Sequence, residues 1–132
     1  MELGKLREEF GRKVGLENFD WRKVKEGKGT QSVKAKEWKE ADGKTGKYTG
    51  EVKGEAREGR GVMEWSTGER YEGGWEKNKP EGYGRKYMSW FGKTSAFEGE
   101  FKEGEWRTGK YFEEGEGGKP VVSEYRTGVR SG

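Results

Sequence analysis

The sequence predicts an all-β protein: an elongated antiparallel sheet of consecutive β-hairpin repeats, with a short helix at the N-terminus. Three observations support this fold. A motif of aromatic residue, any residue, glycine, any residue and apolar residue recurs along the chain. The 132 residues include 25 Gly but only 2 Pro, and so many glycines favour frequent tight turns. Leu3, Leu6, Phe10 and Val14 are spaced as one face of a helix, which Gly15 is expected to end.

The composition favours a thin sheet over a thick globular core. Hydrophobic residues make up only 27% of the chain, and 40% of the residues are charged, against roughly 25% charged residues in an average globular domain. Disordered chains are also highly charged, but they contain few aromatic residues. Because this chain contains six Trp, six Tyr and six Phe, we expect a folded and elongated domain.

The repeated motif occupies residues 48–52, 71–75 and 97–101, so the units begin 23 and then 26 residues apart. In the first two units a Gly-x-Gly pair follows eleven residues after the aromatic residue. We interpret the extra length of the second unit, at 89–96, as a turn insertion. The third unit departs from the pattern, since Gly109 comes twelve residues after its aromatic and Tyr111 replaces the second Gly, which leaves its turn register open. The residues that define the repeat are Tyr48, Gly50, Gly59, Gly61, Tyr71, Gly73, Gly82, Gly84, Phe97 and Gly99.

One hairpin per unit explains the motif. Side chains alternate between the two faces of a strand, so Tyr48, Gly50 and Val52 share one face. A glycine inside a strand often marks a close approach. We therefore predict that Gly50 and its equivalents, Gly73 and Gly99, face a ring contributed by the next unit.

These residues resemble MORN (membrane occupation and recognition nexus) repeats, whose pattern is similar to YxGxW, a turn, and GxG about eleven residues on. The resemblance covers residues 48–112, about half of the chain. It implies a scaffold protein of cytoskeletal, axonemal, membrane-junction or organelle-associated complexes. On this basis the chain divides into an N-terminal helix and arm (1–18), a degenerate capping hairpin (19–47), repeats at 48–70, 71–96 and 97–112, and a C-terminal capping strand and tail (113–132).

The sequence lacks most of the side chains that catalysis and metal binding need. It contains no His and no Cys, which removes the commonest general base, the usual nucleophile pairs and most transition-metal ligands. The Gly-Lys-Thr triplets at 43–45 and 92–94 lack the earlier Gly of a phosphate loop, and we interpret both as hairpin turns. We expect no enzyme activity, no cofactor and no metal, although a carboxylate pair among the many Glu residues stays open.

The charge pattern argues against nucleic acid as a partner. The net charge is +3, and Lys and Glu alternate finely along the chain instead of clustering in a basic stripe. No apolar run reaches the roughly 20 residues of a membrane helix, and no signal peptide is recognisable. We expect a cytoplasmic location, or one peripheral to a membrane or cytoskeletal assembly, with an organelle left open.

The leading functional hypothesis is a structural subunit that binds other proteins of a larger complex through its aromatic side chains and its N-terminal helix. An alternative is that the rings only stack on neighbouring hairpins and that the helix only covers the sheet. The candidate contact residues are Leu3, Leu6, Phe10, Tyr71, Trp75, Tyr83, Trp90, Phe97, Phe101 and Trp106.

A second functional hypothesis is binding to anionic phospholipid, such as a phosphoinositide, an activity that the resemblance to MORN repeats suggests. The basic residues of the N-terminal helix, Arg7 and Arg12 among them, could then lie on a membrane surface. The acidic residues Glu51, Glu72 and Glu98 oppose this hypothesis, because they share the polar face of the first strands.

Overall fold

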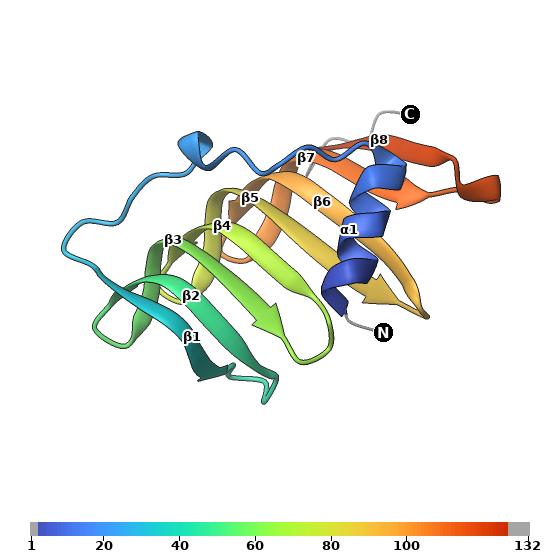
Figure 1. Cartoon of the computed structure of the whole chain (residues 1–132). Coiled ribbons are helices and arrows are strands. Elements are labelled where there is room, and N and C mark those ends of the chain that lie inside the picture. Colours follow the sequence, from blue (N-terminus) through green and yellow to red (C-terminus); the bar gives the residue numbers. More distant parts are fainter. Residues whose placement is uncertain (1–2, 127–132) are drawn as a thin grey trace.

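The computed structural model describes residues 3–126, which form one eight-stranded antiparallel sheet and one α-helix (Figure 1). Neighbouring strands in the sheet are consecutive in the chain, from β1 to β8. The predicted all-β hairpin fold with a short N-terminal helix is therefore confirmed. The elements are α1 (Leu3–Val14), a 3-10 turn (Trp21–Lys23), β1 (Gln31–Lys39), β2 (Thr45–Lys53), β3 (Ala56–Trp65), β4 (Arg70–Glu76), β5 (Lys79–Trp90), β6 (Lys93–Lys102), β7 (Glu105–Glu114), a 3-10 turn (Glu116–Gly118) and β8 (Pro120–Arg126).

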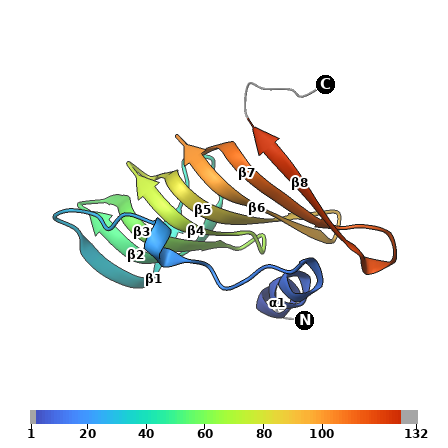
Figure 2. The same ribbon diagram turned by 90° about the horizontal axis from the view of Figure 1, so that it is seen from above.

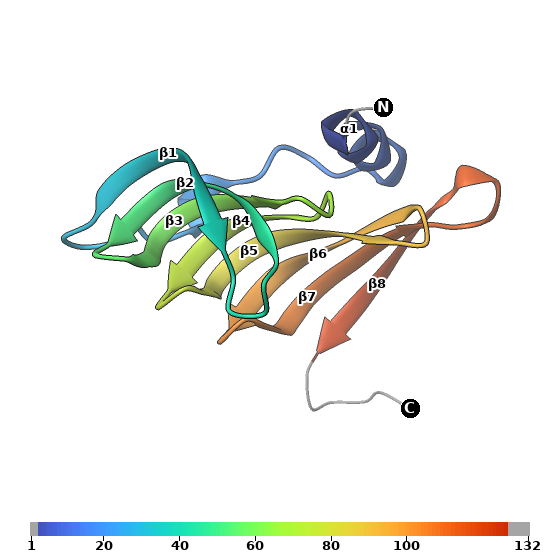
Figure 3. The same cartoon turned by 90° about the horizontal axis from the view of Figure 1, so that it is seen from below.

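Helix α1 lies on one face of the sheet, as Figures 2 and 3 show. It ends at Gly15, where φ is +79°, a backbone conformation that glycine adopts without steric cost. Phe10 and Val14 are buried against Tyr87 and Ala96. The apolar stripe of α1 therefore covers the protein's own sheet, and we call this side of the sheet the helix face.

The opposite side, the ring face, carries the repeated aromatic residues on the even-numbered strands. The rings of Tyr48 on β2 and Trp75 on β4 meet across β3 with centroids 5.6 Å apart. The rings of Tyr71 on β4 and Phe101 on β6 meet across β5 at 5.0 Å. Rings two strands apart can touch only where the strand between them has no side chain in the way, and at those positions β3 and β5 carry the Gly-x-Gly pairs.

In the first two repeats, the glycine that lies beneath a tyrosine ring is the second glycine of the Gly-x-Gly pair. A Cβ on Gly84 would lie 2.1 Å from the hydroxyl oxygen of Tyr71 in the same unit, and Gly61 has the same relation to Tyr48. Gly73 does occupy the predicted equivalent position, directly opposite Gly84. A Cβ there would first meet the Gly84 Cα, at 2.4 Å. The prediction that Gly50, Gly73 and Gly99 face a ring of the next unit is therefore corrected, because the ring comes from the same unit and covers the partner glycine.

The second unit is longer because its strands are longer. Ser89 pairs with Thr94 and Trp90 pairs with Lys93, so β5 and β6 continue to a two-residue turn. The turn residues Phe91 and Gly92 have φ of +49° and +77°, as in the tight type I′ turns that match the twist of a hairpin. The expected turn insertion at 89–96 was therefore wrong.

The third unit keeps the register of the other two by shortening its β-bulge. Gly109 lies opposite Gly99, as Gly61 lies opposite Gly50. The bulge between Gly99 and Phe101 takes up one residue fewer than its counterpart in β2 and β3. The third repeat is therefore one residue shorter between Gly99 and Gly109 than the first repeat is between Gly50 and Gly61. Tyr111 still pairs with Phe97, so the same side chains face the ring face.

The segments that flank the repeats each add one strand to the sheet. Residues 19–47 contain β1 and the start of β2 instead of a separate hairpin, because β1 pairs directly with the first repeat strand. At the other end, β8 pairs with β7 and forms the last strand, while residues 127–132 of the predicted tail lie outside the described residues.

Replacing Gly84 with Ala tests the packing of rings on glycines. The new methyl group would overlap the Tyr71 ring, and overpacking of this kind costs about 1 to 3 kcal/mol. We expect the thermal midpoint of unfolding to fall by several degrees in a circular-dichroism melt. Gly11→Ala is the control, because its Cβ would make only ordinary contact, at 3.7 Å from Leu16, and Ala favours the helix. Equal midpoints for Gly84→Ala and the parent protein would contradict the packing described here.

Candidate partner-binding surface

The rings of the ring face form an unbroken row that fills most of this side of the sheet. Neighbouring rings in the row lie 4.6 to 5.6 Å apart from Trp38 on β1 to Tyr125 on β8. Four of the predicted contact residues, Tyr71, Trp75, Phe97 and Phe101, lie inside this row and are buried. Their side chains contact neighbouring strands and offer almost no surface to another molecule.

The other predicted contact residues lie at different places. Phe10 is buried beneath α1, whereas Leu6 on the same helix is 38% exposed. Tyr83 is half-buried on the helix face, where Phe19 stacks on its ring at 5.6 Å. Trp106 is half-buried near the C-terminal end of the row and stacks on Phe97. The side chains of Leu3 and Trp90 are outside the described part of the structure. The structure therefore does not bring the eight described residues of this set together into one surface.

A buried arginine completes the row at its β1 end. The Arg57 guanidinium lies 4.8 Å from the Trp38 ring centroid and 4.4 Å from that of Trp75, and only 1% of the residue is exposed. Its two terminal nitrogens donate to the two carboxylate oxygens of Glu40, and one also donates to the Asn78 carbonyl at 3.0 Å. A buried charge is tolerated when it is paired and hydrogen-bonded in this way. The planar Arg57 guanidinium therefore packs against the rings of the row in the way that another aromatic ring would.

A lysine occupies the ring face in the second repeat. Lys86 lies opposite Tyr71 and Phe97 in the ladder, at the position that Met63 takes in the first repeat. Burial lowers the pKa of the Lys86 ammonium group. Its Nζ lies 5.7 Å from the Trp65 ring centroid, a distance at which a cation is attracted to the ring.

The helix face holds an N-terminal arm, residues 15–30, through charged side chains that project from the sheet. The Glu51 carboxylate accepts hydrogen bonds from the Gly27 backbone N–H at 3.1 Å and from the Thr30 hydroxyl at 2.7 Å. It also accepts a hydrogen bond from the Arg60 backbone N–H at 2.7 Å, and the Arg60 side chain donates to the Val24 carbonyl at 2.8 Å. One carboxylate therefore ties the arm to both β2 and β3.

A second network fixes the arm to β5 and β6. The Arg85 guanidinium is buried and donates to the Glu17 carbonyl at 2.7 Å, to Glu98 and to the Tyr87 hydroxyl. The Tyr83 hydroxyl also donates to the Glu98 carboxylate. Burial, together with this negatively charged acceptor, raises the pKa of Tyr83, so the phenol keeps its proton at neutral pH. Tyr83 is thus held in place beneath the arm.

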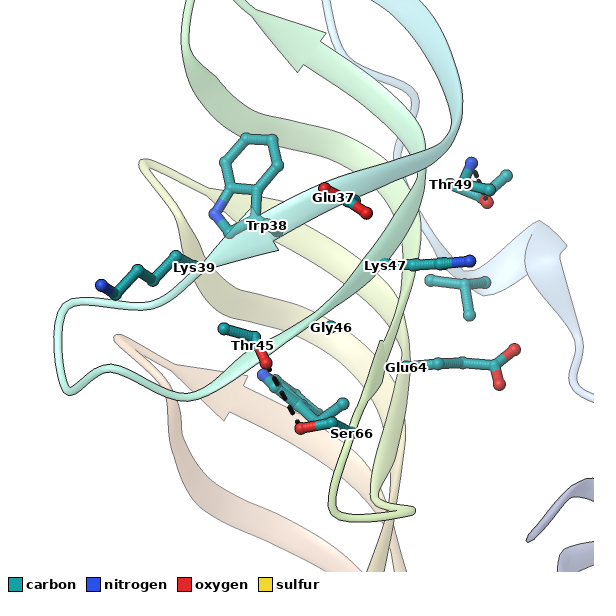
Figure 4. Close-up of a pocket in the computed structure, with 12 residues that line it drawn as sticks. Glu37, Trp38, Lys39, Thr45, Gly46, Lys47, Thr49, Glu64 and Ser66 are labelled. Atoms are coloured by element: carbon teal, nitrogen blue, oxygen red, sulfur yellow. Dashed lines mark hydrogen bonds between the residues drawn. The ribbon is translucent and has the colours of Figure 1, made fainter.

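The first three strands carry a groove that neither α1 nor the arm fills (Figure 4). Figure 4 shows Lys47, Thr49 and Glu64 pointing to one side of these strands, while Trp38 points to the other. Most of the lining belongs to the helix face, by the alternation of side chains along each strand. We call this the β1–β3 groove, and it is lined by Ala35, Glu37, Trp38, Lys39, Thr45, Gly46, Lys47, Thr49, Val62, Glu64, Trp65 and Ser66.

The β1–β3 groove contains charges of both signs and several hydroxyl groups. Glu37 lies directly opposite Lys47 in the ladder. Thr45 and Ser66 lie within hydrogen-bonding distance, with hydroxyl oxygens 3.4 Å apart. Glu64 forms an ion pair with Arg7 of α1, at 3.0 Å, which fixes one wall of the groove. Such a lining fits a polar segment that carries both charges and hydrogen-bonding groups.

The sequence did not identify the groove, because its residues come from three strands and only the pairing of these strands brings them together. Within residues 3–126 no cluster of acidic side chains has the arrangement of a metal site. The same residues include no helix with the length and apolar character needed to cross a membrane.

The Glu51 contacts predict a specific dependence of stability on pH. Burial raises the pKa of Glu51, but the hydrogen bonds donated to its charged form outweigh burial and hold the pKa below the usual value of 4.5. A lowered folded-state pKa means that the stabilisation is complete above the unfolded-state pKa and is lost as the pH falls through the folded-state pKa. We therefore expect the Tm difference between the parent protein and Glu51→Gln to be largest near neutral pH and to shrink below about pH 4.5.

Thermal melts of both proteins between acidic and neutral pH measure this difference. Glu55→Gln is the control, because Glu55 is exposed in the turn between β2 and β3 and its substitution should leave the Tm unchanged at every pH. A Tm difference for Glu51→Gln that is constant over the whole range would show that the carboxylate charge does not hold the arm.

Comparison with known protein families identifies the repeated hairpins. The family model of the MORN repeat matches residues 48–70 and 71–89. These two segments contain the hairpins in which the Gly-x-Gly strand lies beneath a tyrosine ring. No curated protein sequence matches the chain significantly. MORN repeats are typical of proteins that interact with membranes or with other proteins. The repeat matches and the hairpin array agree, and the chain contains MORN repeats at residues 48–70 and 71–89.

Proposed function

We propose that this protein is a non-enzymatic MORN-repeat scaffold, an accessory subunit of a larger assembly that binds a protein partner in its β1–β3 groove. The observation that carries the proposal is the mixed chemistry of that groove: Glu37 and Lys47 lie side by side, next to the hydroxyl groups of Thr45, Thr49 and Ser66. A protein segment carries charges of both signs and hydrogen-bonding groups, so it can complement such a lining.

The ring row supports this proposal by making the groove rigid. Tyr48 and Met63, on the ring face of the strands that form the groove, are fully buried. Most groove residues project from the other side of the same strands, so the positions of their backbone atoms are set before a partner arrives. Such preorganisation reduces the entropy lost on binding.

Lipid binding is the second candidate, and the arm supplies the observation that favours it. Arg22, Lys23, Lys25 and Lys28 lie in the arm and are exposed. A cluster of basic side chains outside the sheet can be attracted to an anionic membrane surface. The β1–β3 groove itself does not favour an anionic membrane, because its lining contains the acidic Glu37 and Glu64 as well as the basic Lys39 and Lys47.

Charge-reversal variants test the groove. Lys47→Glu and Glu37→Lys each place like charges opposite one another in the ladder, whereas the double swap Glu37→Lys with Lys47→Glu restores an oppositely charged pair. We expect capture of the partner from native extract to be lost in all three variants. The double swap should keep the thermal midpoint of the parent protein, which separates loss of binding from loss of stability. Lys119→Glu, in the exposed turn before β8, is the matched control and should bind like the parent.

Vesicle co-sedimentation tests the lipid candidate with the same proteins. Attraction to a phosphoinositide vesicle should weaken steeply as salt shortens the Debye length from about 10 Å at 0.1 M to about 3 Å at 1 M. Strong, salt-sensitive sedimentation that persists in the groove variants, with no protein captured by the parent, would replace the scaffold proposal with the lipid one.

A further inference from the structure

The last strand of the sheet, β8, has an outer edge to which no described residue is paired. We propose that this edge pairs with β8 of a second copy of the chain, in antiparallel orientation, to form a two-fold symmetric dimer with one continuous sheet. The proposal is independent of the groove, which residues of β1, β2 and β3 and the turn after β3 line. Figure 2 shows these strands at the opposite end of the sheet from β8.

The backbone of β8 presents hydrogen-bonding groups along this edge. The Gly115 N–H donates to the Lys119 carbonyl at 2.6 Å, and alternate pairs of the antiparallel ladder repeat that arrangement. The backbone groups of Ser123 therefore point toward β7, whereas those of Val122 and Glu124 point outward. Pro120 also points outward and has no N–H, so this end of the edge offers only its carbonyl to a second strand.

The side chains of β8 leave apolar surface exposed on both faces of the sheet. Val121 and Tyr125 on the ring face are 39% and 41% exposed, and Val122 on the helix face is 49% exposed. Within the repeats, a ring such as Phe97 is covered by rings on both sides. Among the described residues, Tyr125 has ring contacts with Phe97 and Trp106 on one side, so the described ring row ends at β8 with a partly exposed ring.

The other edge of the sheet is protected against pairing. β1 carries Lys34, Lys36 and Lys39, and a bulge between Val33 and Lys36 interrupts its ladder with β2. Lysines and bulges are the devices by which proteins prevent pairing at a sheet edge. Addition of β8 to β1 of the next copy would produce an open filament, so this protection favours a closed dimer through β8 alone.

The sequence of β8 is compatible with pairing to itself. Ser123 is the middle residue of Pro120–Arg126, and a two-fold axis at Ser123 aligns all seven residues of both copies. Val121 then lies opposite Tyr125 of the second copy on the ring face, a pairing of β-branched and aromatic residues that stabilises sheets. Val122 and Glu124 exchange their outward backbone hydrogen bonds across the axis. An edge of seven residues is small for an interface, so we expect a weak dimer that forms with increasing concentration.

Cysteine cross-linking tests this register directly, because the natural chain contains no cysteine. In the proposed dimer the two Ser123 residues face each other as a non-hydrogen-bonded pair with Cα atoms about 4.5 Å apart, within the range that a disulfide spans. We expect Ser123→Cys to form a covalent dimer under diamide oxidation. Ser32→Cys on the exposed β1 edge is the matched control and should stay monomeric. Cross-linking only in a mixture of the two variants would show head-to-tail association and overturn the proposal.

Sedimentation equilibrium between about 1 μM and 1 mM, the range of weak association, tests the dimer without cross-linking. Glu124→Pro removes an outward N–H while leaving the ladder with β7 in place, and we expect it to raise the dimer dissociation constant at least tenfold. Glu124→Gln keeps the N–H and should dimerise like the parent. A parent protein that stays monomeric over the whole range would overturn the proposal, even if a cysteine variant cross-links.

Discussion

The contact between an aromatic ring and a glycine on the neighbouring strand is the interaction on which the sheet depends. Tyr48 lies over Gly61 and Tyr71 lies over Gly84, so the even-numbered strands supply rings and the strands between them supply the space. The rings then meet one another across those strands and bury themselves without a second layer of sheet. A chain with 27% hydrophobic residues can therefore build a continuous core, because each ring buries a large apolar area.

Charged residues complete this core where apolar residues are lacking. Arg57 extends the row of rings and forms an ion pair with Glu40, and Glu40 also accepts a hydrogen bond from the Trp65 indole N–H. On the helix face, the Glu51 carboxylate accepts a hydrogen bond from the Gly27 backbone N–H, and the Arg85 guanidinium donates one to the Glu17 backbone carbonyl, so both side chains bind the backbone of the arm. Polar contacts thus hold the arm together with the buried Val24 and the stacked Phe19, so charged side chains take part in the packing of this protein.

The same construction determines where other molecules can bind. Rings such as Tyr71 and Phe97 contribute rigidity but no binding surface, because they are fully buried. The two ends of the sheet offer surfaces of different kinds. At the β1 end, the groove places charges of both signs and hydroxyl groups on a rigid support. At the β8 end, Tyr125 and Val121 are partly exposed beside an edge to which no residue of 3–126 is paired. The two ends differ in chemistry, which suits the binding of a polar partner at one end and self-association at the other.

The sequence by itself determined the class of fold, the hairpin repeats and the position of the N-terminal helix, because these features follow from local spacing: aromatic and glycine residues at fixed intervals and apolar residues at helical intervals. It also led to the MORN repeat through Tyr48, Gly50 and their equivalents. Only the tertiary structure decided which glycine lies beneath which ring, that the third repeat keeps its register through a shorter bulge, and that Tyr71, Trp75, Phe97 and Phe101 are buried. The β1–β3 groove and the roles of Arg57 and Glu51 likewise required the structure. These features depend on how strands pair and on contacts between residues far apart in the chain. The alternation of side chains along a strand is the same whether a ring packs on its own hairpin, on the next hairpin or on a partner, so the sequence pattern could not distinguish these cases.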